Sequence, residues 1–403
     1  MRISTIQAFN NGVQGLQRNY ANAIRTQEQI STGNRILTPA DDPVASVRLL
    51  QLEQQQNVLT QYKDNLTAAQ NSLTQEESTL ATVENVLQQV RSLAVRAGNG
   101  SLSLEDRQSI ANELSAREDE LLSLMNTRNS RGEYLFSGFQ GKTQPFERQA
   151  DGSYAYMGDD GQRKLQIASS LELPISDSGR SVFNSGLNAA RLSVDNTDGI
   201  ISGIQVQDEV SFGSFPLGGF TLSFDAADPL NYTLTPGDGS APVTGRLNEG
   251  GDTALSYQGV SFYVNGAPAA GSSYTIDQSA AGASEPNTRV NPLNVIADLR
   301  KVLDSSTDSR EIRDSVSLAV ANLDSTMDAV DQGRGRVGAR MNVISSTLTD
   351  NEDVTLVNKA TQADLRELDY AEALSRLSMQ SMVLQASQQS YVRIASLSLF
   401  NQL

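Results

Sequence analysis

Apolar side chains recur at alternating intervals of three and four residues along the first 30 residues of the chain. With one polar exception at Gln27, the pattern is carried by Ile6, Phe9, Val13, Leu16, Tyr20, Ala23 and Ile30. This spacing is that of an a/d heptad seam, which turns one stripe of an α-helix towards a partner helix. We therefore expect an amphipathic N-terminal arm that, with the loop after it, occupies residues 1–42.

A much longer helix is expected after this arm. A glycine and a proline within residues 31–42 end the helical pattern, and Asp42 followed by Pro43 is typical of an N-cap and a first helical turn. Leucines then recur every seven residues over 52–87, with no glycine or further proline among them. Such a helix would be roughly 80 Å long at 1.5 Å per residue. A second apolar pattern follows two glycines, so residues 43–145 are predicted to form a helical hairpin.

The C-terminal third of the chain repeats this logic in reverse order. Apolar residues stand seven apart at Val316, Leu323, Val330, Val337 and Ile344. They predict long helices over residues 291–350. The polar stretch 351–361 is expected to bend the chain before a last amphipathic arm, the whole spanning residues 351–403. The apolar positions of that arm are Leu374, Leu377, Leu384, Tyr391, Ile394, Leu397 and Phe400.

Glycine and aromatic residues gather between these helical ends. Of 30 glycines, 14 fall within 199–282, and of 22 Phe and Tyr residues, 16 fall within 134–274. Aromatic runs broken by turn residues are typical of β-strands, here expected at 220–224, 232–234 and 260–264. Residues 154–156 and 165–167 are expected to pair as a hairpin around Asp160 and Gly161.

These patterns predict an α+β fold. The N- and C-terminal segments form a long antiparallel helical coiled-coil core, and the middle of the chain supplies β-rich outer domains. We expect two such β-rich pieces, residues 146–198 and residues 199–290, with their boundary near residues 186–203.

Composition removes many classes of function. The chain has 403 residues and a formal net charge of −16, so the phosphate backbone of nucleic acids and anionic lipid headgroups would repel it. We expect neither nucleic acid nor a membrane as partner. Cysteine and histidine are both absent, which excludes disulfides, thiolate nucleophiles, zinc ribbons and the usual catalytic triads. The first 20 residues lack a basic end followed by an apolar run, so a cleaved secretory leader is not expected.

Residues 333–338 match the spacing GxGxxG, which in dinucleotide-binding proteins joins a strand to a helix. Here the heptad of apolar residues continues through the motif, so we interpret it as a closely packed or kinked helix. Arg334, Arg336 and Arg340 form the strongest basic cluster of the chain. They are expected to pair with carboxylates on a neighbouring helix or subunit.

Three acidic runs are candidates for carboxylate chemistry. They are Glu76-Glu77, Glu118-Asp119-Glu120 and Asp159-Asp160. Each falls on a predicted helix surface or turn without convergent polar partners, so each is interpreted as a solvated face. A calcium loop of the EF-hand type is also absent from the sequence. The chain is therefore predicted to be no enzyme, with no catalytic residue, metal ligand or cofactor-binding residue.

The two terminal arms are the most informative feature. They could bury one another as an ordinary antiparallel coiled coil within a monomer. The apolar stripe of one thin helix, however, does not offset the conformational entropy lost when about 30 residues are ordered. Concentrated and repeated neighbours, as in a polymer, would supply the missing burial.

Six motifs together resemble the bacterial flagellin superfamily. They are residues 1–5 (MRIST), residues 31–36 with 41–43 (STGNRI, DDP), residues 134–139 (YLFSGF), residues 337–342 (VGARMN), residues 369–373 (DYAEA) and residues 398–403 (SLFNQL). With residues 259–276 they represent roughly 250 residues. Flagellins read DDAAG at the second motif and lack the third and the last. These departures favour the hook–filament junction branch of the superfamily, with flagellin itself as the alternative. Residues 199–251 match no motif of the family.

The resemblance implies a structural protein of the bacterial flagellum. It implies unfolded export through the flagellar type III channel, helped by a cytoplasmic export chaperone that binds the C-terminal arm. Outside the cell it implies a homo-oligomeric ring, with hook-associated protein 1 on the hook side and flagellin on the filament side. A carboxylate-dependent surface enzyme or adhesin is a distant third interpretation.

The arms and the loop motif together define the expected assembly interface. Its residues are Ile6, Phe9, Val13, Leu16, Tyr20, Ile30, Arg35, Asp41, Asp42, Leu384, Tyr391, Ile394, Leu397, Leu399 and Phe400.

Overall fold

The computed structural model describes residues 2–194, 198–278 and 288–400, without the side chains of residues 2–6, 8 and 394–400. The chain divides into two compact units. The terminal unit comprises Met1–Asp64 and Ser346–Leu403, and the central unit comprises Asn65–Ser345. The helices are α1 (Arg2–Thr32), α2 (Pro43–Ala97), α3 (Leu104–Met125), α4 (Gly179–Phe183), α5 (Glu209–Phe212), α6 (Pro292–Ser305), α7 (Ser309–Arg366) and α8 (Tyr370–Phe400).

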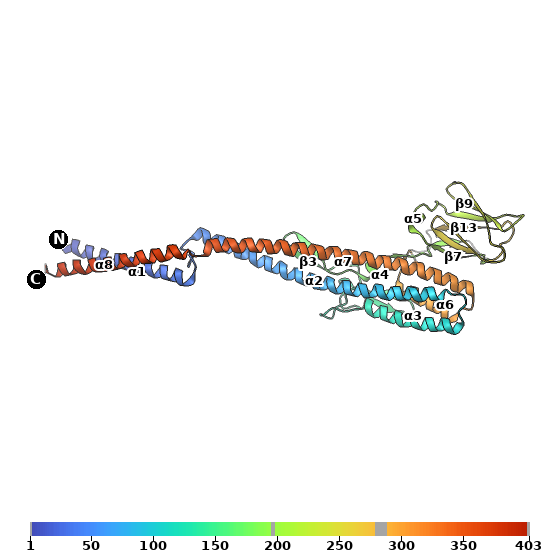
Figure 1. Cartoon of the computed structure of the whole chain (residues 1–403), viewed down its shortest axis with the longest axis horizontal. Coiled ribbons are helices and arrows are strands. Elements are labelled where there is room, and N and C mark those ends of the chain that lie inside the picture. Colours follow the sequence, from blue (N-terminus) through green and yellow to red (C-terminus); the bar gives the residue numbers. More distant parts are fainter. Residues whose placement is uncertain (1, 195–197, 279–287, 401–403) are drawn as a thin grey trace. The chain divides into compact units, whose positions relative to one another are not determined.

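In the terminal unit, α1 and α8 lie side by side (Figure 1). They run antiparallel, because Phe9 packs on Tyr391 while Asn19, further along α1, donates a hydrogen bond to Ser387, earlier on α8. The first part of α2 likewise contacts the last part of α7, with Lys63 3.1 Å from Glu352. The predicted arms are thus helices that pair with one another.

The expected bend at residues 351–361 is wrong. These residues are helical, and α7 continues to Arg366. The stretch is polar but contains neither glycine nor proline, so nothing in it breaks a helix. The break before the last arm lies at residues 367–369, and the expected limit between residues 350 and 351 falls inside a helix.

The central unit has a helical core built on the predicted leucine seam. Leu66, Leu73, Leu80 and Leu87 of α2 are fully buried, as are Leu323, Val330 and Val337 of α7. The return helix α3 begins with a capping box between Ser103 and Asp106 and lies against α6. Both helices of the predicted hairpin are present, and Arg96 near the end of α2 lies 3.0 Å from Glu113 of α3. The expected long C-terminal helices begin with the separate 14-residue helix α6.

Two small hairpins follow α3 along the chain. β1 (Phe146–Arg148) pairs with β2 (Tyr154–Tyr156), and β3 (Lys164–Ala168) pairs with β4 (Leu171–Pro174). The expected pairing of 154–156 with 165–167 is therefore wrong. The reason is Asp159, whose carboxylate accepts hydrogen bonds from the backbone of Phe139, Gln140 and Gly161, so this segment is a loop held against the Phe139 turn.

The outer β-rich part consists of two antiparallel sheets. A five-stranded sheet has the order β10-β9-β8-β13-β6, and a three-stranded sheet has the order β11-β12-β7. The strands are β6 (Leu192–Val194), β7 (Ile201–Val206), β8 (Phe220–Phe224), β9 (Asn231–Pro236), β10 (Val243–Arg246), β11 (Thr253–Tyr257), β12 (Val260–Val264) and β13 (Ser273–Gln278). The short strands β5 (Gly186–Leu187) and β14 (Arg289–Val290) pair separately. β6 joins the outer sheet although its residues precede the expected boundary at 198.

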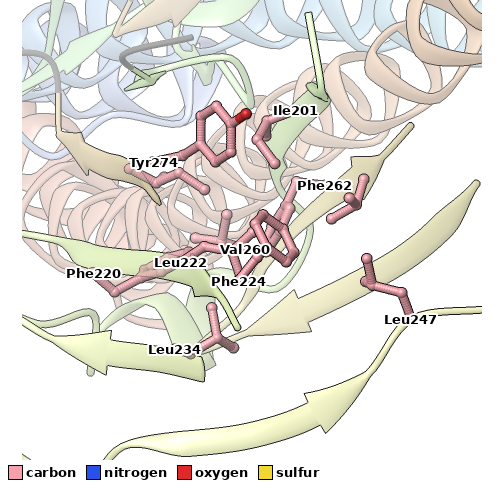
Figure 2. Packing of buried hydrophobic residues seen from close by; sticks show 11 residues of the cluster. Ile201, Phe220, Leu222, Phe224, Leu234, Leu247, Val260, Phe262 and Tyr274 are labelled. Atoms are coloured by element: carbon pink, nitrogen blue, oxygen red, sulfur yellow. The ribbon is translucent and has the colours of Figure 1, made fainter. Parts of the chain in front are cut away.

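The core of this part lies between the inner faces of the two sheets. Phe220, Leu222 and Phe224 alternate with outward Thr221 and Ser223 along β8, as a half-buried strand requires. Figure 2 shows their side chains close to Val260 and Phe262 of β12. The predicted strands 220–224, 232–234 and 260–264 are therefore confirmed as parts of β8, β9 and β12.

Candidate assembly surface

Charge and exposed apolar area are distributed unequally between the two units. The terminal unit carries 10 basic and 12 acidic residues, a net charge of −2, whereas the central unit carries 21 basic and 35 acidic residues, a net charge of −14. Of the 25 large apolar side chains that are exposed among the described residues, 16 belong to the terminal unit, which has less than a third of the chain. The terminal unit is therefore nearly neutral and unusually apolar at its surface.

The α1–α8 pair covers only part of the predicted seam. The rings of Phe9 and Tyr391 have their centroids 5.2 Å apart, yet Phe9 remains 45% exposed. Tyr20 lies outside the pair and is 58% exposed. Half-buried positions are Val13, Leu16, Ile30 and Leu384. The side chains of Ile6, Ile394, Leu397, Leu399 and Phe400 lie outside the described part of the chain.

Several large apolar side chains of α8 remain uncovered beside α1. Leu374, Met379, Met382, Val383 and Val392 are all exposed, with Met379 at 65% and Met382 at 66%. A helix paired with a single partner buries one stripe, so apolar side chains elsewhere on α8 stay in contact with water. Contact with further helices would remove this surface from water, which is the driving force for association.

The two breaks that precede α2 and α8 are bonded to each other. The Arg35 amide donates to the carbonyl of Arg366 over 2.8 Å, and the Leu368 amide donates to the carbonyl of Gly33 over 3.0 Å. The Arg366 guanidinium also donates to the Asn34 side chain over 3.0 Å. We call residues 33–42 and 366–369 the double hinge, because each arm begins or ends there.

Glycine is required at the entrance to the double hinge. Gly33 has φ +70°, and a Cβ atom placed on it would lie 2.9 Å from the hydroxyl oxygen of Tyr370. The glycine therefore allows the first turn of α8 to approach the loop. Asn34, Arg366 and Tyr370 were not predicted as partners in this region, and the glycine in the STGNRI motif was the available signal of a close approach.

The three predicted interface residues of the loop bond within their own chain. Asp41 accepts hydrogen bonds from the Leu37 and Thr38 amides and pairs with Arg25. Asp42 accepts from the Ala45 amide over 3.0 Å, which confirms it as the N-cap of α2.

Arg35 connects both sides of the double hinge. It donates to the Leu365 carbonyl over 3.1 Å and lies 3.5 Å from Asp42. The geometry gives Arg35, Asp41 and Asp42 a positioning role at the hinge, and their contact with a partner stays a prediction.

Two arginines of the α7 cluster, Arg334 and Arg340, pair with carboxylates as expected, whereas Arg336 donates to the Ser181 carbonyl over 3.4 Å. Arg334 contacts Glu77 and Glu84 of the neighbouring helix α2, with 2.8 Å between its Nη2 atom and Glu77. Arg340 pairs with Asp177, which precedes α4. Residues 333–338 are helical, so the GxGxxG spacing does not form the strand–turn–helix of a dinucleotide site.

Two of the acidic residues expected to be solvated are buried, which corrects that interpretation. Glu118 is 1% exposed and accepts hydrogen bonds from Tyr154 over 2.6 Å and from Arg300 over 3.0 Å. Through these bonds it links α3, β2 and α6. Hydrogen bonds from such partners replace those that water would donate to the carboxylate, so the side chain can lie in the interior.

Glu76 is the second exception and is 2% exposed. Burial, and then the neighbouring Asp177 carboxylate, raise the pKa of Glu76 to about 8, because both disfavour a second negative charge there. Its Oε1 atom has no hydrogen-bond partner among the described residues. Heptad position placed Glu76 in the seam, and the acidic run wrongly suggested a solvent-facing side chain.

The described residues contain no group of three or more Asp and Glu side chains arranged to hold a metal ion. Within that part of the chain, the helices are also too short in continuous apolar residues for any of them to cross a bilayer.

Two family models match the ends of the chain. The bacterial flagellin N-terminal helical region matches residues 3–141, and the bacterial flagellin C-terminal helical region matches residues 320–403. Together they cover more than half of the 403 residues, and they include α1, α2, α3 and α8 and most of α7.

Individual relatives agree with these matches. Flagellar hook-associated protein 3 of Salmonella typhimurium is 33% identical over 198 residues, which are 49% of this chain and 62% of that protein. The match thus spans less than two thirds of that relative. Flagellin B of Vibrio anguillarum is 25% identical over 383 residues, 94% of this chain and 90% of that protein.

A solved structure shares the fold. The crystal structure of the flagellar junction protein FlgL from Legionella pneumophila superposes with a TM-score of 0.60 at 26% identity, covering 79% of this chain and 100% of that one. The terminal helices, their pairing and these matches lead to one conclusion. The chain belongs to the bacterial flagellin family.

Proposed function

We propose that this protein is the structural subunit of the hook–filament junction of the bacterial flagellum. In this proposal a homo-oligomeric ring joins hook-associated protein 1 on the hook side to flagellin on the filament side, and filament assembly and motility depend on it. The observation that carries the proposal is the concentration of exposed apolar side chains on the nearly neutral terminal unit. Such a surface suits repeated contacts between copies and with related helical proteins.

The chemistry of each unit supports a division of roles. The terminal unit, with a net charge of −2, can be packed at high local density without strong repulsion between copies. The central unit, with a net charge of −14, would repel its equivalents if it were packed as closely, so the closest contacts between equivalent surfaces are assigned to the terminal unit. The role is mechanical, and the long helices α2 and α7 carry load between contacts.

A junction role is favoured over that of a filament subunit. The hook-associated relative is 33% identical where it aligns, against 25% for the Vibrio flagellin. Pro43 and Val44 also stand where flagellins have alanines, and residues 136–139 form the Phe-Ser-Gly-Phe turn that flagellins lack. Flagellin itself is the second candidate, because the Vibrio match extends over 94% of the chain.

Export and chaperone binding are part of the same proposal. The protein would be secreted through the flagellar export channel and would function outside the cell. Before export, the chaperone would cover exposed apolar side chains of α8, among them Met379, Met382 and Val392. An amphipathic helix of this kind is suited to a hydrophobic groove on a partner.

Polymerisation of the purified protein tests the proposal. Alone, at concentrations at which flagellin forms long filaments, the protein is expected to form only short assemblies or none, as seen by electron microscopy. Added to isolated hooks that end in hook-associated protein 1, it is expected to enable growth of a flagellin filament. Long filaments of the protein alone would instead identify it as a flagellin.

A further inference from the structure

A groove of about 440 Å³ lies in the central unit between α2, the turn that contains Phe139, and β3. Its floor is apolar, with Ala68 from α2 and Leu165 and Ile175 from the β3–β4 hairpin. Phe139 stands on its rim and is 68% exposed. An exposed aromatic ring beside an apolar floor is typical of contact surfaces.

The lining of the groove carries three cations and no carboxylate. The cations are Arg131, Arg163 and Lys164, in a chain that has 47 acidic and 31 basic residues. Arg163 donates to Glu133 over 2.6 Å, and Arg131 lies 3.6 Å from the same carboxylate. Within the described ranges Lys164 is exposed and forms no ion pair. The single carboxylate of Glu133 leaves a net positive charge on the three cations. An acidic partner would neutralise this charge.

A complementary surface exists on this same chain. Residues 350–357 of α7 have three acidic residues among their first four and continue with exposed Val354, Leu356 and Val357. Glu352 pairs with Lys63, whereas Asp350 and Asp353 form no ion pair in the part of the chain that the structure describes. The segment therefore offers two uncompensated carboxylates beside an apolar patch with Leu356 at 68% and Val357 at 63% exposure.

Sequence position favours contact between neighbouring copies. Lys63, the ion-pair partner of Glu352, precedes Asn65 on α2 by two residues, about 3 Å along a helix axis. Asn65 lines the groove. In a ring, rotation about the axis brings one surface of each copy against a different surface of the next, so a groove and a complementary segment of the same chain can meet.

We propose that the groove lined by Arg131, Arg163, Lys164 and Phe139 receives residues 350–357 of α7 from a neighbouring copy of this chain. The inference rests on the proposed function, because it needs the ring. Lys164 and Arg131 would face Asp353 and Asp350, and Leu356 or Val357 would cover the apolar floor and Phe139. The contact is heterologous, so each copy would use its groove on one side and its α7 segment on the other.

Cysteine cross-linking in assembled flagella tests this contact directly, because the chain has no cysteine of its own. The double variant Lys164→Cys, Asp353→Cys is expected to give a ladder of disulfide-linked multimers on a non-reducing gel. Each single variant should remain monomeric. The matched control Lys301→Cys, Asp353→Cys replaces an exposed lysine on α6, away from the groove, and should give no ladder.

Filament growth and cross-linking separate the two proposals. Normal filaments without a ladder, or with an intramolecular cross-link only, would overturn the groove contact and leave the junction role intact. If cells that lack the protein have no filaments while cells that carry the cysteine variants do, the junction role is supported, whether or not the gel shows a ladder. If cells without the protein still grow normal filaments, the junction role itself is wrong.

Charge reversal provides the second readout, should the cysteines impair assembly. Lys164→Glu and Asp353→Lys are each expected to weaken the contact by about tenfold or more, since each places like charges opposite one another. The double reversal restores opposite charges and should recover filament number, whereas Lys301→Glu should have no effect. Equal filament numbers in all variants, or two single losses that the double reversal does not repair, would contradict the contact.

Discussion

Phe9 on α1 and Tyr391 on α8 pack ring against ring with their centroids 5.2 Å apart, although 382 positions separate them in the chain. The contact joins the first helix to the last, so each arm depends on the other for its observed packing. Because Phe9 is still 45% exposed, the pair is only half of a helical packing arrangement. Neighbouring copies would supply the remainder.

The arms should therefore be much less stable than the central unit in a dilute monomer. Two helices with one shared stripe bury too little apolar surface to offset the entropy of ordering them. Hydrogen exchange measured by mass spectrometry should show fast exchange over residues 7–30 and 370–393 in the monomer and slow exchange in assembled flagella. Equal protection of the arms and of α3 in the monomer would contradict this.

The leucine seam of α2 should dominate the stability of the central unit. Leu73 is fully buried, and replacing it with alanine should lower the free energy of unfolding by about 2–5 kcal/mol. Gln70→Ala, an exposed position on the same helix, is the control and should change it by less than about 0.5 kcal/mol. Urea unfolding followed by circular dichroism measures both, and equal losses would show that the seam is not the core.

Glu76 should make stability fall as pH rises. Its pKa in the folded protein, about 8, lies above its ordinary value of 4.5, so between these values the folded state binds a proton that the unfolded state has lost. The free energy of unfolding should decline through this window and level off above pH 8. The charged groups around Glu76 are Asp177 before α4 and Arg336 and Arg340 on α7.

The variant Glu76→Gln should flatten this pH dependence, because it cannot ionise. Glu172→Gln, at an exposed position on β4, is the matched control and should leave the slope as it is. Thermal unfolding between pH 5 and pH 9 provides the measurement. A parent protein with the same slope as Glu76→Gln would show that Glu76 does not titrate in this range.

Arg313 should fix the outer sheets to α7. Its guanidinium lies 3.7 Å from the ring centroid of Tyr263 on β12 and 2.8 Å from Asp252. Arg313→Ala should speed proteolytic cleavage around residues 199 and 289 by several-fold, since it removes a stacked and hydrogen-bonded cation. Arg246→Ala, which breaks an ion pair within the outer sheets, should not. If the Arg313→Lys variant resists proteolysis as well as the parent protein does, the stacking of the guanidinium on the Tyr263 ring is unimportant.

Periodicity predicted the long helices of the fold, apart from the bend wrongly expected at residues 351–361 of α7. The heptads over Leu66, Leu73 and Leu80 identified a helix whose core face is the one observed, because a seven-residue repeat leaves little choice of partner face. Of the strands of the outer sheets, β8, β9 and β12 were predicted from aromatic alternation. The order in which the strands pair depends on contacts distant in sequence, so it had no local signal.

Polar interactions were the main source of error. A carboxylate such as Glu118 is buried only because Tyr154 and Arg300 reach it from other elements, and no pattern along α3 reveals those partners. Asp159 prevented the expected hairpin in the same way, by bonding to the Phe139 turn. The loop residues Arg35, Asp41 and Asp42 were singled out by motif, but their bonding within the double hinge became visible only when Arg366 was placed beside them.

A strain that lacks this protein gives the most direct test of the junction role. If the protein joins hook to filament, the mutant should build complete hooks, carry no filaments, and release monomeric flagellin into the medium, because the hook end would offer no surface on which flagellin can assemble. The measurement is electron microscopy of the cells together with an immunoblot of cell-free medium. Hooks that still carry normal filaments would contradict the account. So would a mutant in which the hook–filament junction is intact and only the filament is missing, because the protein would then be the main subunit of the filament.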